Sequence, residues 1–384
     1  MPRVLFFVGA DWYFWSHRLT IARAARDAGY EVLVLTHVDR FGESMRQEGF
    51  TVVPIEFVRG FGSFFYELKA FLAVARAYRR VRPDLVHQVS PKCILYGSLA
   101  ARLSGVRVLV NTLPGLGYLF TSRQWRSRLL RPFVTNAFRL LLAGRHTRVI
   151  VQNPDDRKDL ARRRVVPERN LVLIRGSGVD TARFAPSPEP PSPVLFALVS
   201  RMLEGKGISE FVEAARILRE TGAAARFVLV GGPDSQNPDS LKPEQLEAWN
   251  GEGFIEWWGK RDDVERVWAA AHVAVLPSYD EGIPKSLLEA AACGRPIVAT
   301  DIPGCREIVR DGENGLLIPP RDAPALAVAM KRLIADAALR QSLGRRGREI
   351  VLAEFSDAIV AEKTMEVYRA LLGSVPAAPA ATPR

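Results

Sequence analysis

Short apolar runs alternate with amphipathic segments along the first half of the chain. Runs this short and this rich in Val, Leu and Phe are typical of parallel strands buried on both faces. Between them, segments 16–28 and 64–81 carry apolar residues at helical spacing. The alternation predicts an open, doubly wound α/β sheet. The expected strands lie at 4–8, 32–35, 85–89, 106–110 and 149–151.

The segment 185–193 interrupts this pattern, because five of its nine residues are proline. Such a segment forms neither a helix interior nor a central strand, and it is typical of a semi-rigid linker. The alternation then restarts, with a helix expected at 208–220. The chain therefore predicts two Rossmann-like domains in tandem. The strands expected in the second domain lie at 194–199, 227–230, 254–257, 272–276 and 297–299.

A chain of 384 residues is also too long for one ordinary core. We expect an N-terminal domain over 1–185, a Pro-rich linker over 186–193 and a second domain over 194–352. Helices in 353–374 are expected to pack back toward the first domain, followed by a disordered tail over 375–384.

Positive charge is concentrated in the first half of the chain. Residues 1–185 hold 30 Lys and Arg against 14 Asp and Glu, a net charge of +16, whereas the remainder carries −5. The basic half fits nucleic acid, anionic lipid or phosphorylated ligands. No apolar run reaches the ~18–20 residues that span a bilayer, and we expect no signal peptide. The scattered Cys93, Cys293 and Cys305 favour neither disulfides nor zinc, so a cytoplasmic location is expected.

The most specific motif covers residues 278–289, which follow one expected strand and open a helix. Glu281 lies in the loop, where a carboxylate can accept hydrogen bonds from sugar hydroxyls, and Glu289 lies about two turns into the helix, where it can hold a ribose. Backbone N–H groups near Gly282, Ile283 and Pro284 mark a helix N-terminus suited to a diphosphate. The alternative is an acidic first turn that complements the helix dipole.

Two cations flank a Gly-containing turn after the first strand of the second domain. Arg201 and Lys206 stand at the expected carboxyl edge of the sheet, where they can neutralise a diphosphate leaving group. A solvated loop is the alternative for Lys206. Because this motif and the glutamate motif occur together, in this order and each after an expected strand, a binding site is favoured over two unrelated surface loops.

Taken together, these motifs resemble the family 4 glycosyltransferases, which have the GT-B fold: two Rossmann-like doubly wound parallel-sheet domains with an interdomain cleft. The resemblance covers nearly the whole chain. It is nearest to bacterial polysaccharide and N-glycan enzymes that add an N-acetylhexosamine, often GalNAc, to a polyprenyl-diphosphate-linked sugar. The segments that carry it are 201–206, 230–232, 281–289, 293–300, 311–315 and 317–319, with 14–19, 115–118 and 151–156 in the first half.

This resemblance implies a role for each matching residue. Arg201 and Lys206 would contact the donor diphosphate, Glu281 the transferred sugar and Glu289 the ribose. Other donor contacts would come from Gly232, Lys260, Arg261, Gly282, Ile283, Pro284 and Leu288. Such enzymes retain the anomeric configuration and need no metal or other cofactor beyond the nucleotide-sugar donor, here expected to be UDP-linked. The sequence offers no Asp-x-Asp pair at a strand end.

For the acceptor, the resemblance points to the first domain. Where many relatives have a histidine after the strand expected here at 85–89, this chain has Lys92, which would meet an acceptor phosphate or a leaving-group oxygen, or be an ordinary surface lysine. His17 could contact the acceptor or be a satisfied loop histidine. Arg18, Gly115 and Gly117 complete the expected acceptor site.

Segment 121–148 contains seven arginines and no acidic residue, interspersed with aromatic and aliphatic side chains. This pattern favours an interfacial segment on the anionic inner face of the bacterial cytoplasmic membrane, with an Arg-rich packed helix as the alternative. We expect no nucleic-acid partner, since no module of that class is present. The expected membrane contacts are Arg123, Trp125, Arg126, Arg128 and Arg131.

Three other functions fit parts of the pattern less well. A UDP-N-acetylglucosamine 2-epimerase shares the architecture but lacks the paired Arg/Lys and Glu motifs in this form. A nicotinamide dehydrogenase needs GxGxxG after the first strand, and residues 8–13 read VGADWY. A non-catalytic subunit of a polysaccharide assembly complex has no positive support.

Overall fold

The computed structural model describes residues 1–58, 62–114, 125–234, 237 and 239–373, with the side chains of 125–131 excluded. The chain divides into two compact units. Unit 1 comprises Met1–Ile174 together with the chain from Val360 onward, and unit 2 comprises Arg175–Ile359. The division falls eleven residues before the Pro-rich segment expected to be the linker, so 175–185 belong to unit 2.

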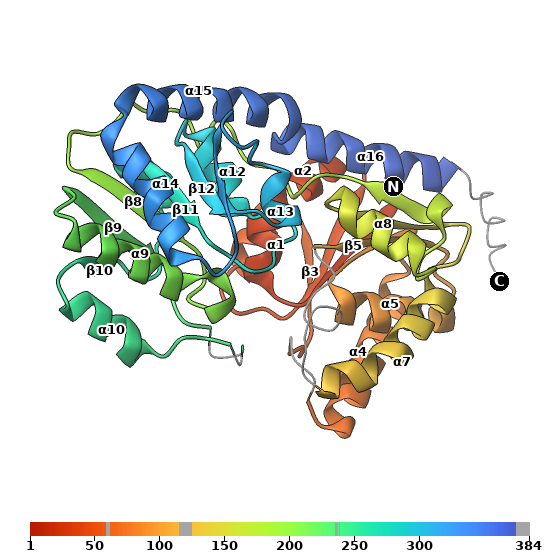
Figure 1. The fold of residues 1–384 in the computed structure, drawn as a ribbon. Coiled ribbons are helices and arrows are strands. Elements are labelled where there is room, and N and C mark those ends of the chain that lie inside the picture. The colour runs from red at the N-terminus through yellow and green to blue at the C-terminus, as the bar shows by residue number, and fades with distance from the viewer. Residues whose placement is uncertain (59–61, 115–124, 235–236, 238, 374–384) are drawn as a thin grey trace, which may run out of the picture. The chain divides into compact units, whose positions relative to one another are not determined.

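Unit 1 is built on a seven-stranded sheet in which every pairing is parallel, with the order β3-β2-β1-β4-β5-β6-β7 (Figure 1). Its two central strands, β1 and β4, are almost wholly buried, as continuous apolar runs predict. The strands are β1 (Arg3–Val8), β2 (Glu31–Thr36), β3 (Thr51–Pro54), β4 (Leu85–Val89), β5 (Val108–Leu113), β6 (Thr147–Val151) and β7 (Leu171–Leu173).

Helices cover both faces of this sheet. One face packs on α4 (Phe64–Val81) and α5 (Pro91–Ser104), with α7 (Trp125–Leu141) contacting α5. The other face packs on α2 (Leu19–Asp27) and α16 (Asp357–Gly373), whose Val360, Met365, Tyr368 and Leu371 enter the core. The other helices of the described part of unit 1 are α1 (Asp11–His17), α3 (Gly42–Gln47), α8 (Pro154–Arg162) and the 3₁₀ turn Glu168–Asn170.

Unit 2 repeats the design with a six-stranded parallel sheet in the order β10-β9-β8-β11-β12-β13. Its strands are β8 (Val194–Val199), β9 (Ala225–Val230), β10 (Ile255–Trp257), β11 (Val273–Leu276), β12 (Ile297–Thr300) and β13 (Gly315–Ile318). Its helices are α9 (Ile208–Glu220), α10 (Pro243–Gly251), α11 (Val264–Ala270), α12 (Lys285–Ala292), α13 (Pro303–Arg306), α14 (Ala323–Ala335) and α15 (Ala337–Glu354), with a 3₁₀ turn at Glu204–Lys206.

The predicted pair of doubly wound α/β sheets is confirmed, with several local differences. Helices expected at 64–81 and 208–220 have those bounds, and the side chain of Asn153 caps α8, accepting from the Asp156 N–H at 2.7 Å. The helix expected at 16–28 is instead two helices, α1 and α2, separated at Arg18, whose φ is −127°. Strands β3, β7 and β13 were not predicted.

Among the described residues, we find no helix long and apolar enough to cross a membrane.

Candidate functional site

The strand order of unit 2 reverses between β8 and β11, which lie side by side in the sheet. In open parallel sheets, ligands bind at the carboxyl ends of the strands where the order reverses. The loop after β8 begins at Ser200, and the loop after β11 begins at Pro277. Both predicted donor motifs follow these two strands, so the fold brings them to one edge.

Two glycines let the loops at this edge approach closely. Gly207 has φ of +71°, and a Cβ built on it would lie 2.0 Å from the Pro277 carbonyl oxygen. Gly231 has φ of +144°, and its Cβ would lie 1.7 Å from the Ser200 oxygen. Since any side chain would collide with backbone at both positions, the loops after β8, β9 and β11 pack as one group.

Lys206 and Glu281 form an ion pair across this edge although 75 residues separate them in the chain. Lys206 closes a 3₁₀ turn, and its Nζ donates a hydrogen bond to Oε1 of Glu281 in the loop that precedes α12. Both side chains are largely buried, with 19% and 11% exposed. The fold therefore places a cation and a carboxylate side by side at this edge.

Arg201 lies in the same loop as Lys206 but is exposed. Its Nη1 donates to Oδ2 of Asp234 at 2.8 Å. Asp234 follows β9 and was not predicted as a site residue, although its place four residues after the end of a parallel strand is a usable signal. The second predicted cation is therefore also held by a carboxylate at this edge.

The second glutamate, Glu289, is the fifth residue of α12, which begins at Lys285. It therefore lies just over one turn into the helix rather than about two. Its carboxylate is 4.0 Å from the Lys285 ammonium, and burial raises its pKa above the usual range. Pro284 is the N-cap residue and has no N–H, so the N–H groups available before the helix are those of Gly282 and Ile283.

The residues expected around the base lie beside one another. A Cβ on Gly232 would stand 3.6 Å from the Lys260 Cβ, and Gly231 N–H donates to the Gly259 carbonyl at 2.8 Å. Arg261 points to a local partner, with its Nη2 2.7 Å from Oδ2 of Asp263. Gly232 and Lys260 are therefore neighbours, whereas Arg261 is engaged by its own loop.

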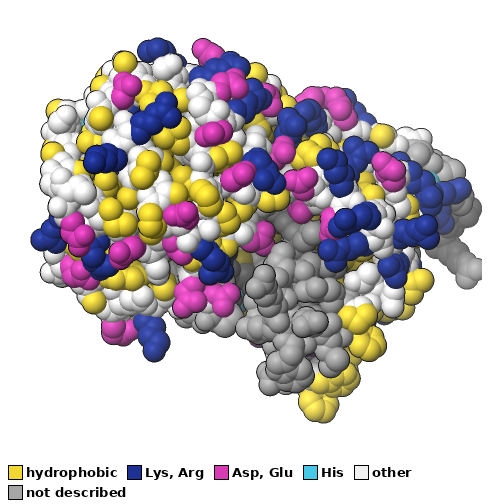
Figure 2. Space-filling view, in the orientation of Figure 1, with side chains coloured by type: hydrophobic (Ala, Val, Ile, Leu, Met, Phe, Trp, Pro, Cys, Tyr) yellow, Lys and Arg dark blue, Asp and Glu magenta, His cyan; other side chains and the backbone are white. Residues whose placement is uncertain are grey.

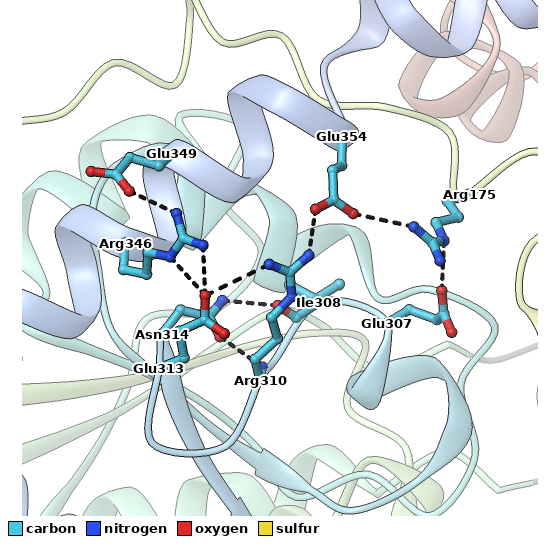
Figure 3. A network of polar contacts seen from close by, with 9 residues as sticks. All are labelled: Arg175, Glu307, Ile308, Arg310, Glu313, Asn314, Arg346, Glu349 and Glu354. Atoms are coloured by element: carbon cyan, nitrogen blue, oxygen red, sulfur yellow. Dashed lines mark hydrogen bonds and ion pairs between the residues drawn. The ribbon is translucent and has the colours of Figure 1, made fainter.

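The motif at 311–315 has a structural role. Asn314 accepts from the Arg310 N–H at 2.7 Å and donates to the Ile308 carbonyl at 2.8 Å, which closes the turn before β13. Figure 3 shows Glu313 and Arg346 joining this turn to α15, at 2.6 Å. Arg310 also pairs with Glu354, which pairs with Arg175, and Arg175 in turn pairs with Glu307. These residues brace the edge strand and helix that support the site.

In unit 1 the strand order reverses between β1 and β4. The residue after β4, Ser90, has φ of +89°, which is strained for a residue with a side chain and is a feature that clusters at functional sites. It precedes Lys92, the predicted acceptor residue on α5. The carboxyl edge of the unit 1 sheet is therefore a second candidate site, indicated by its own strand order and by the backbone at Ser90.

Lys92 is only 7% exposed and points into its own unit. Its Nζ lies 2.9 Å from Oε2 of Glu67 and between 4.9 and 5.8 Å from the ring centres of Phe57, Tyr66 and Tyr96. Each ring attracts the ammonium through its π face. The three rings form an aromatic cage, and together with the Glu67 carboxylate they hold the Lys92 ammonium between α4 and α5. The ammonium is therefore buried and already has partners, unlike that of an open phosphate-binding lysine.

Arg18 is 2% exposed, and its Nε and Nη2 have no hydrogen-bond partner among the residues that the structure describes. Its Nη1 donates to the neighbouring His17 carbonyl at 3.1 Å, and its guanidinium stands 6.0 Å from the Tyr13 ring centre. Burial, and then the Arg18 charge, hold the pKa of His87 well below its usual range. An unpaired buried guanidinium is costly, so Arg18 is suited to receive an anion.

His17 is held by its own helix. Its ring stacks on Tyr13, with centres 4.2 Å apart, and its Nδ1 lies 2.6 Å from the Ser16 hydroxyl. The other acceptor and membrane predictions stay predictions, because Gly115, Gly117 and Arg123 fall outside the described residues. The same holds for the side chains of Trp125, Arg126, Arg128 and Arg131.

Two family models match the chain. "Glycosyl transferase 4-like" matches residues 3–153, and "Glycosyl transferases group 1" matches residues 193–336.

Among curated proteins, the chain is similar to the N,N'-diacetylbacillosaminyl-diphospho-undecaprenol alpha-1,3-N-acetylgalactosaminyltransferase of Campylobacter jejuni. The identity is 27%, over 97% of this chain and 100% of that protein. It is also similar to the UDP-Gal:alpha-D-GlcNAc-diphosphoundecaprenol alpha-1,3-galactosyltransferase of Escherichia coli. Here the identity is 26%, over 80% of each chain.

Solved structures agree on the architecture. The sucrose-phosphate synthase of Thermosynechococcus elongatus matches with a TM-score of 0.81 and 22% identity, over 98% of this chain and 100% of that one. Anabaena HepE in complex with UDP and glucose matches with a TM-score of 0.79 and 20% identity, over the same shares. The predicted GT-B fold is confirmed.

Proposed function

Because the chain is a glycosyltransferase, with one glycosyltransferase family model matching each half, we propose that it moves a hexosamine or hexose from a UDP-sugar to a polyprenyl-diphosphate-linked glycan. N-acetylgalactosamine is the first choice of sugar. The names of two relatives support this acceptor class, since both contain a diphospho-undecaprenol sugar. The reaction belongs to cell-surface polysaccharide assembly.

The observation that carries the proposal is the Lys206–Glu281 pair at the carboxyl edge of unit 2. In the free protein the two charges neutralise each other. When a donor binds, its diphosphate takes over Lys206, and Glu281 is released to accept hydrogen bonds from the sugar. Arg201, which is exposed and paired with Asp234, supplies a second cation to the same diphosphate.

In the proposed reaction, the bond between the sugar's anomeric carbon and the diphosphate oxygen breaks, and the acceptor oxygen bonds to that carbon from the same face. The anomeric configuration is thereby retained. Negative charge grows on the departing diphosphate, where Lys206 and Arg201 stabilise it without a metal ion. The departing phosphate oxygen takes the acceptor hydroxyl's proton, which balances the transfer.

For the acceptor we propose Arg18 as the contact to its diphosphate. Two nitrogens of this buried guanidinium lack partners within the described part of the chain, and a phosphate would supply both a negative charge and hydrogen-bond acceptors. Lys92 is left out of this role because Glu67 and three aromatic rings already engage it. An acceptor of this kind lies in a membrane, so we propose peripheral attachment to the inner face of the cytoplasmic membrane.

A donor screen tests the proposal. UDP-linked GalNAc, GlcNAc, Gal and Glc are offered separately with a short-chain polyprenyl-diphosphate sugar, and products are identified by mass spectrometry. The expected result is one added N-acetylhexosamine, with UDP-GalNAc preferred and the α-anomer formed. Free epimerised UDP-sugar in the absence of acceptor, or no transfer from any donor, would overturn the assignment.

A further inference from the structure

Most of the large hydrophobic side chains that stand exposed among the described residues lie on three neighbouring helices of unit 1. Helix α5 contacts both α4 and α7, so the three form one layer. Figure 2 shows hydrophobic side chains gathered at the lower end of this layer, where α4 begins in Figure 1. The exposed residues of the layer are Phe64, Phe65, Leu68 and Leu72 on α4, Leu99 and Leu103 on α5, and Phe133 and Leu140 on α7.

The two most exposed aromatic residues stand together at the first turn of α4. Phe64 is 75% exposed and Phe65 is 81% exposed, with ring centres 5.9 Å apart. Leu68 and Leu72 continue the same strip at helical spacing. An apolar projection of this kind on a folded surface marks a site of contact with a partner or a membrane.

The projecting turn is firmly anchored. Ser63 caps the helix, accepting from the Tyr66 N–H, and the Tyr66 hydroxyl accepts from the Val58 N–H at 2.8 Å. One turn on, Glu67 faces inward and binds Lys92 and the Tyr96 hydroxyl. The two Phe rings are therefore exposed on a helix whose start is fixed by its buried side, rather than on a loose end.

The charge of this layer selects the occupant. The sequences of α4, α5 and α7 contain one acidic residue, Glu67, and Lys92 already pairs with it. Past the apolar strip, the outer face of α4 carries Arg76, Arg79 and Arg80. By contrast, α16 on the opposite face of the sheet carries three acidic residues, Asp357, Glu362 and Glu366, beside two basic ones, Lys363 and Arg369. An apolar tip followed by cations is complementary to an anionic bilayer, whose headgroups lie above its hydrocarbon.

We propose that the α4–α5–α7 layer is the membrane-contacting surface, with Phe64 and Phe65 entering the boundary between headgroups and acyl chains. Arg76, Arg79 and Arg80 then lie at the level of the lipid phosphates. This surface shares helix α7 with the arginine-rich segment 121–148 singled out in the sequence, and it adds the apolar strip and the cations of α4. The inference rests on the proposed lipid-linked acceptor, and it adds which residues dock.

Flotation with vesicles tests the surface. The double variant Phe64→Ser/Phe65→Ser is compared with wild type on phosphatidylglycerol-containing and on pure phosphatidylcholine vesicles. Removing two inserting rings should lower the partition coefficient on both lipids, by about tenfold or more. Arg76→Gln, Arg79→Gln and Arg80→Gln together should lower it by roughly fivefold per residue on the anionic vesicles at low salt, and little on the neutral ones.

Val328→Ser/Leu352→Ser is the matched control, since both residues are exposed hydrophobics of unit 2, and it should float like wild type. Unchanged flotation of the Phe variant would overturn the proposal. So would sedimentation showing a wild-type dimer that the Phe variant abolishes, because the surface would then join two copies.

Transfer to a short-chain, water-soluble acceptor separates this inference from the proposed function. The Phe variant should keep its rate with that acceptor and lose most transfer to a long-chain acceptor in vesicles. Wild-type transfer to the soluble acceptor without any flotation would sink the membrane surface and leave the function standing. Flotation that depends on Phe64 and Phe65, without transfer to any acceptor, would support the membrane surface and overturn the proposed function.

Discussion

A lysine–glutamate pair that joins distant parts of the chain lies near the carboxyl edge of the sheet in each unit, and the two pairs differ in what surrounds them. In unit 2, Lys206 pairs with Glu281 between two loops, with 19% of the lysine side chain exposed. In unit 1, Lys92 pairs with Glu67 between two helices, 7% exposed and facing three aromatic rings. Both pairs join residues far apart in the chain.

The difference separates a pair that can change partners from one that cannot. The Lys206 ammonium lies between loops and can bind a phosphate when the Glu281 carboxylate leaves it to bind a sugar, at little cost in free energy. A cation inside an aromatic cage would have to leave three rings and a carboxylate, and refill the space it vacated. We therefore interpret the first pair as part of the reaction and the second as part of the framework.

The largest effect should come from Lys206→Ala. We expect kcat/KM to fall by roughly two to four powers of ten, because preorganised charge opposite the leaving diphosphate is lost. Unfolding free energy should also fall, by about 1–3 kcal/mol, because Glu281 is only 11% exposed and loses its cation. Steady-state kinetics beside thermal unfolding measure both.

The exposed Lys331→Ala on α14 is the control and should leave the rate unchanged. A folded Lys206→Ala enzyme with near wild-type rates would make the loop pair a surface feature and remove the contrast.

Lys92→Met should lower stability and leave the rate nearly unchanged. Leaving Glu67 without its cation in a largely buried place should cost about 3 kcal/mol of folding free energy. Transfer to a soluble acceptor by the folded fraction should change only a fewfold. Adding Glu67→Gln should recover part of the lost stability. Chemical denaturation of the single and double variants gives the coupling, and a hundredfold loss of rate at unchanged stability would reverse the interpretation.

The same pair predicts how stability depends on pH. Burial raises the pKa of Glu67, but bonds from Tyr96, the Gly62 N–H and Lys92 outweigh it, so the net pKa is lowered. A lowered pKa in the folded state stabilises above the unfolded pKa, and that stability is lost as pH falls through the folded pKa. Lys92→Met should therefore flatten the acid side of the stability curve between about pH 5 and 3. An unchanged slope would mean that Lys92 does not set the ionisation of Glu67.

A smaller effect should divide the two glutamates of unit 2. Glu289→Ala should weaken UDP binding by roughly tenfold, because it removes the carboxylate assigned to the ribose. Glu281→Ala should leave UDP affinity nearly unchanged and mainly slow transfer. Calorimetric titration with UDP beside turnover is the measurement, and equal losses of UDP affinity in both variants would break the assignment.

The smallest expected effect is that of EDTA. If Lys206 and Arg201 supply the charge that a divalent cation supplies elsewhere, excess chelator should leave most activity. Rates are compared with and without EDTA, and again after adding Mg²⁺ or Mn²⁺. Strict dependence on an added metal would show that the two cations are insufficient.

Much of the fold could be predicted because its central strands are continuous apolar runs. Edge strands escaped this signal: β3 has two partly buried residues between two exposed ones, and it ends in Pro54. The break at Arg18 was equally hidden, since apolar spacing runs through α1 and α2 without interruption. The local hydrophobic pattern indicates which residues are buried. The edge strand β3 and the break at Arg18 depend instead on neighbours that are distant in sequence.

For the site, motif order predicted which loops gather at the carboxyl edge of unit 2. It could not predict partners, because Glu281 and Asp234 reach their cations only once the sheet has formed. Lys92 shows the same limit: its cage draws on rings at positions 57, 66 and 96, which no spacing rule connects. Residue type indicated the chemistry, and packing decided which lysine is available for it.

Helix α16 has a consequence for how the protein is made. It follows unit 2 in the chain, yet its Val360, Met365, Tyr368 and Leu371 complete a core of unit 1. Unit 2 is one continuous stretch and can close as soon as it leaves the ribosome. Unit 1 must wait, with the apolar surface around Phe6 and Val34 uncovered, until the last helix is translated. The half synthesised first is therefore finished last, and any stall late in translation leaves it open.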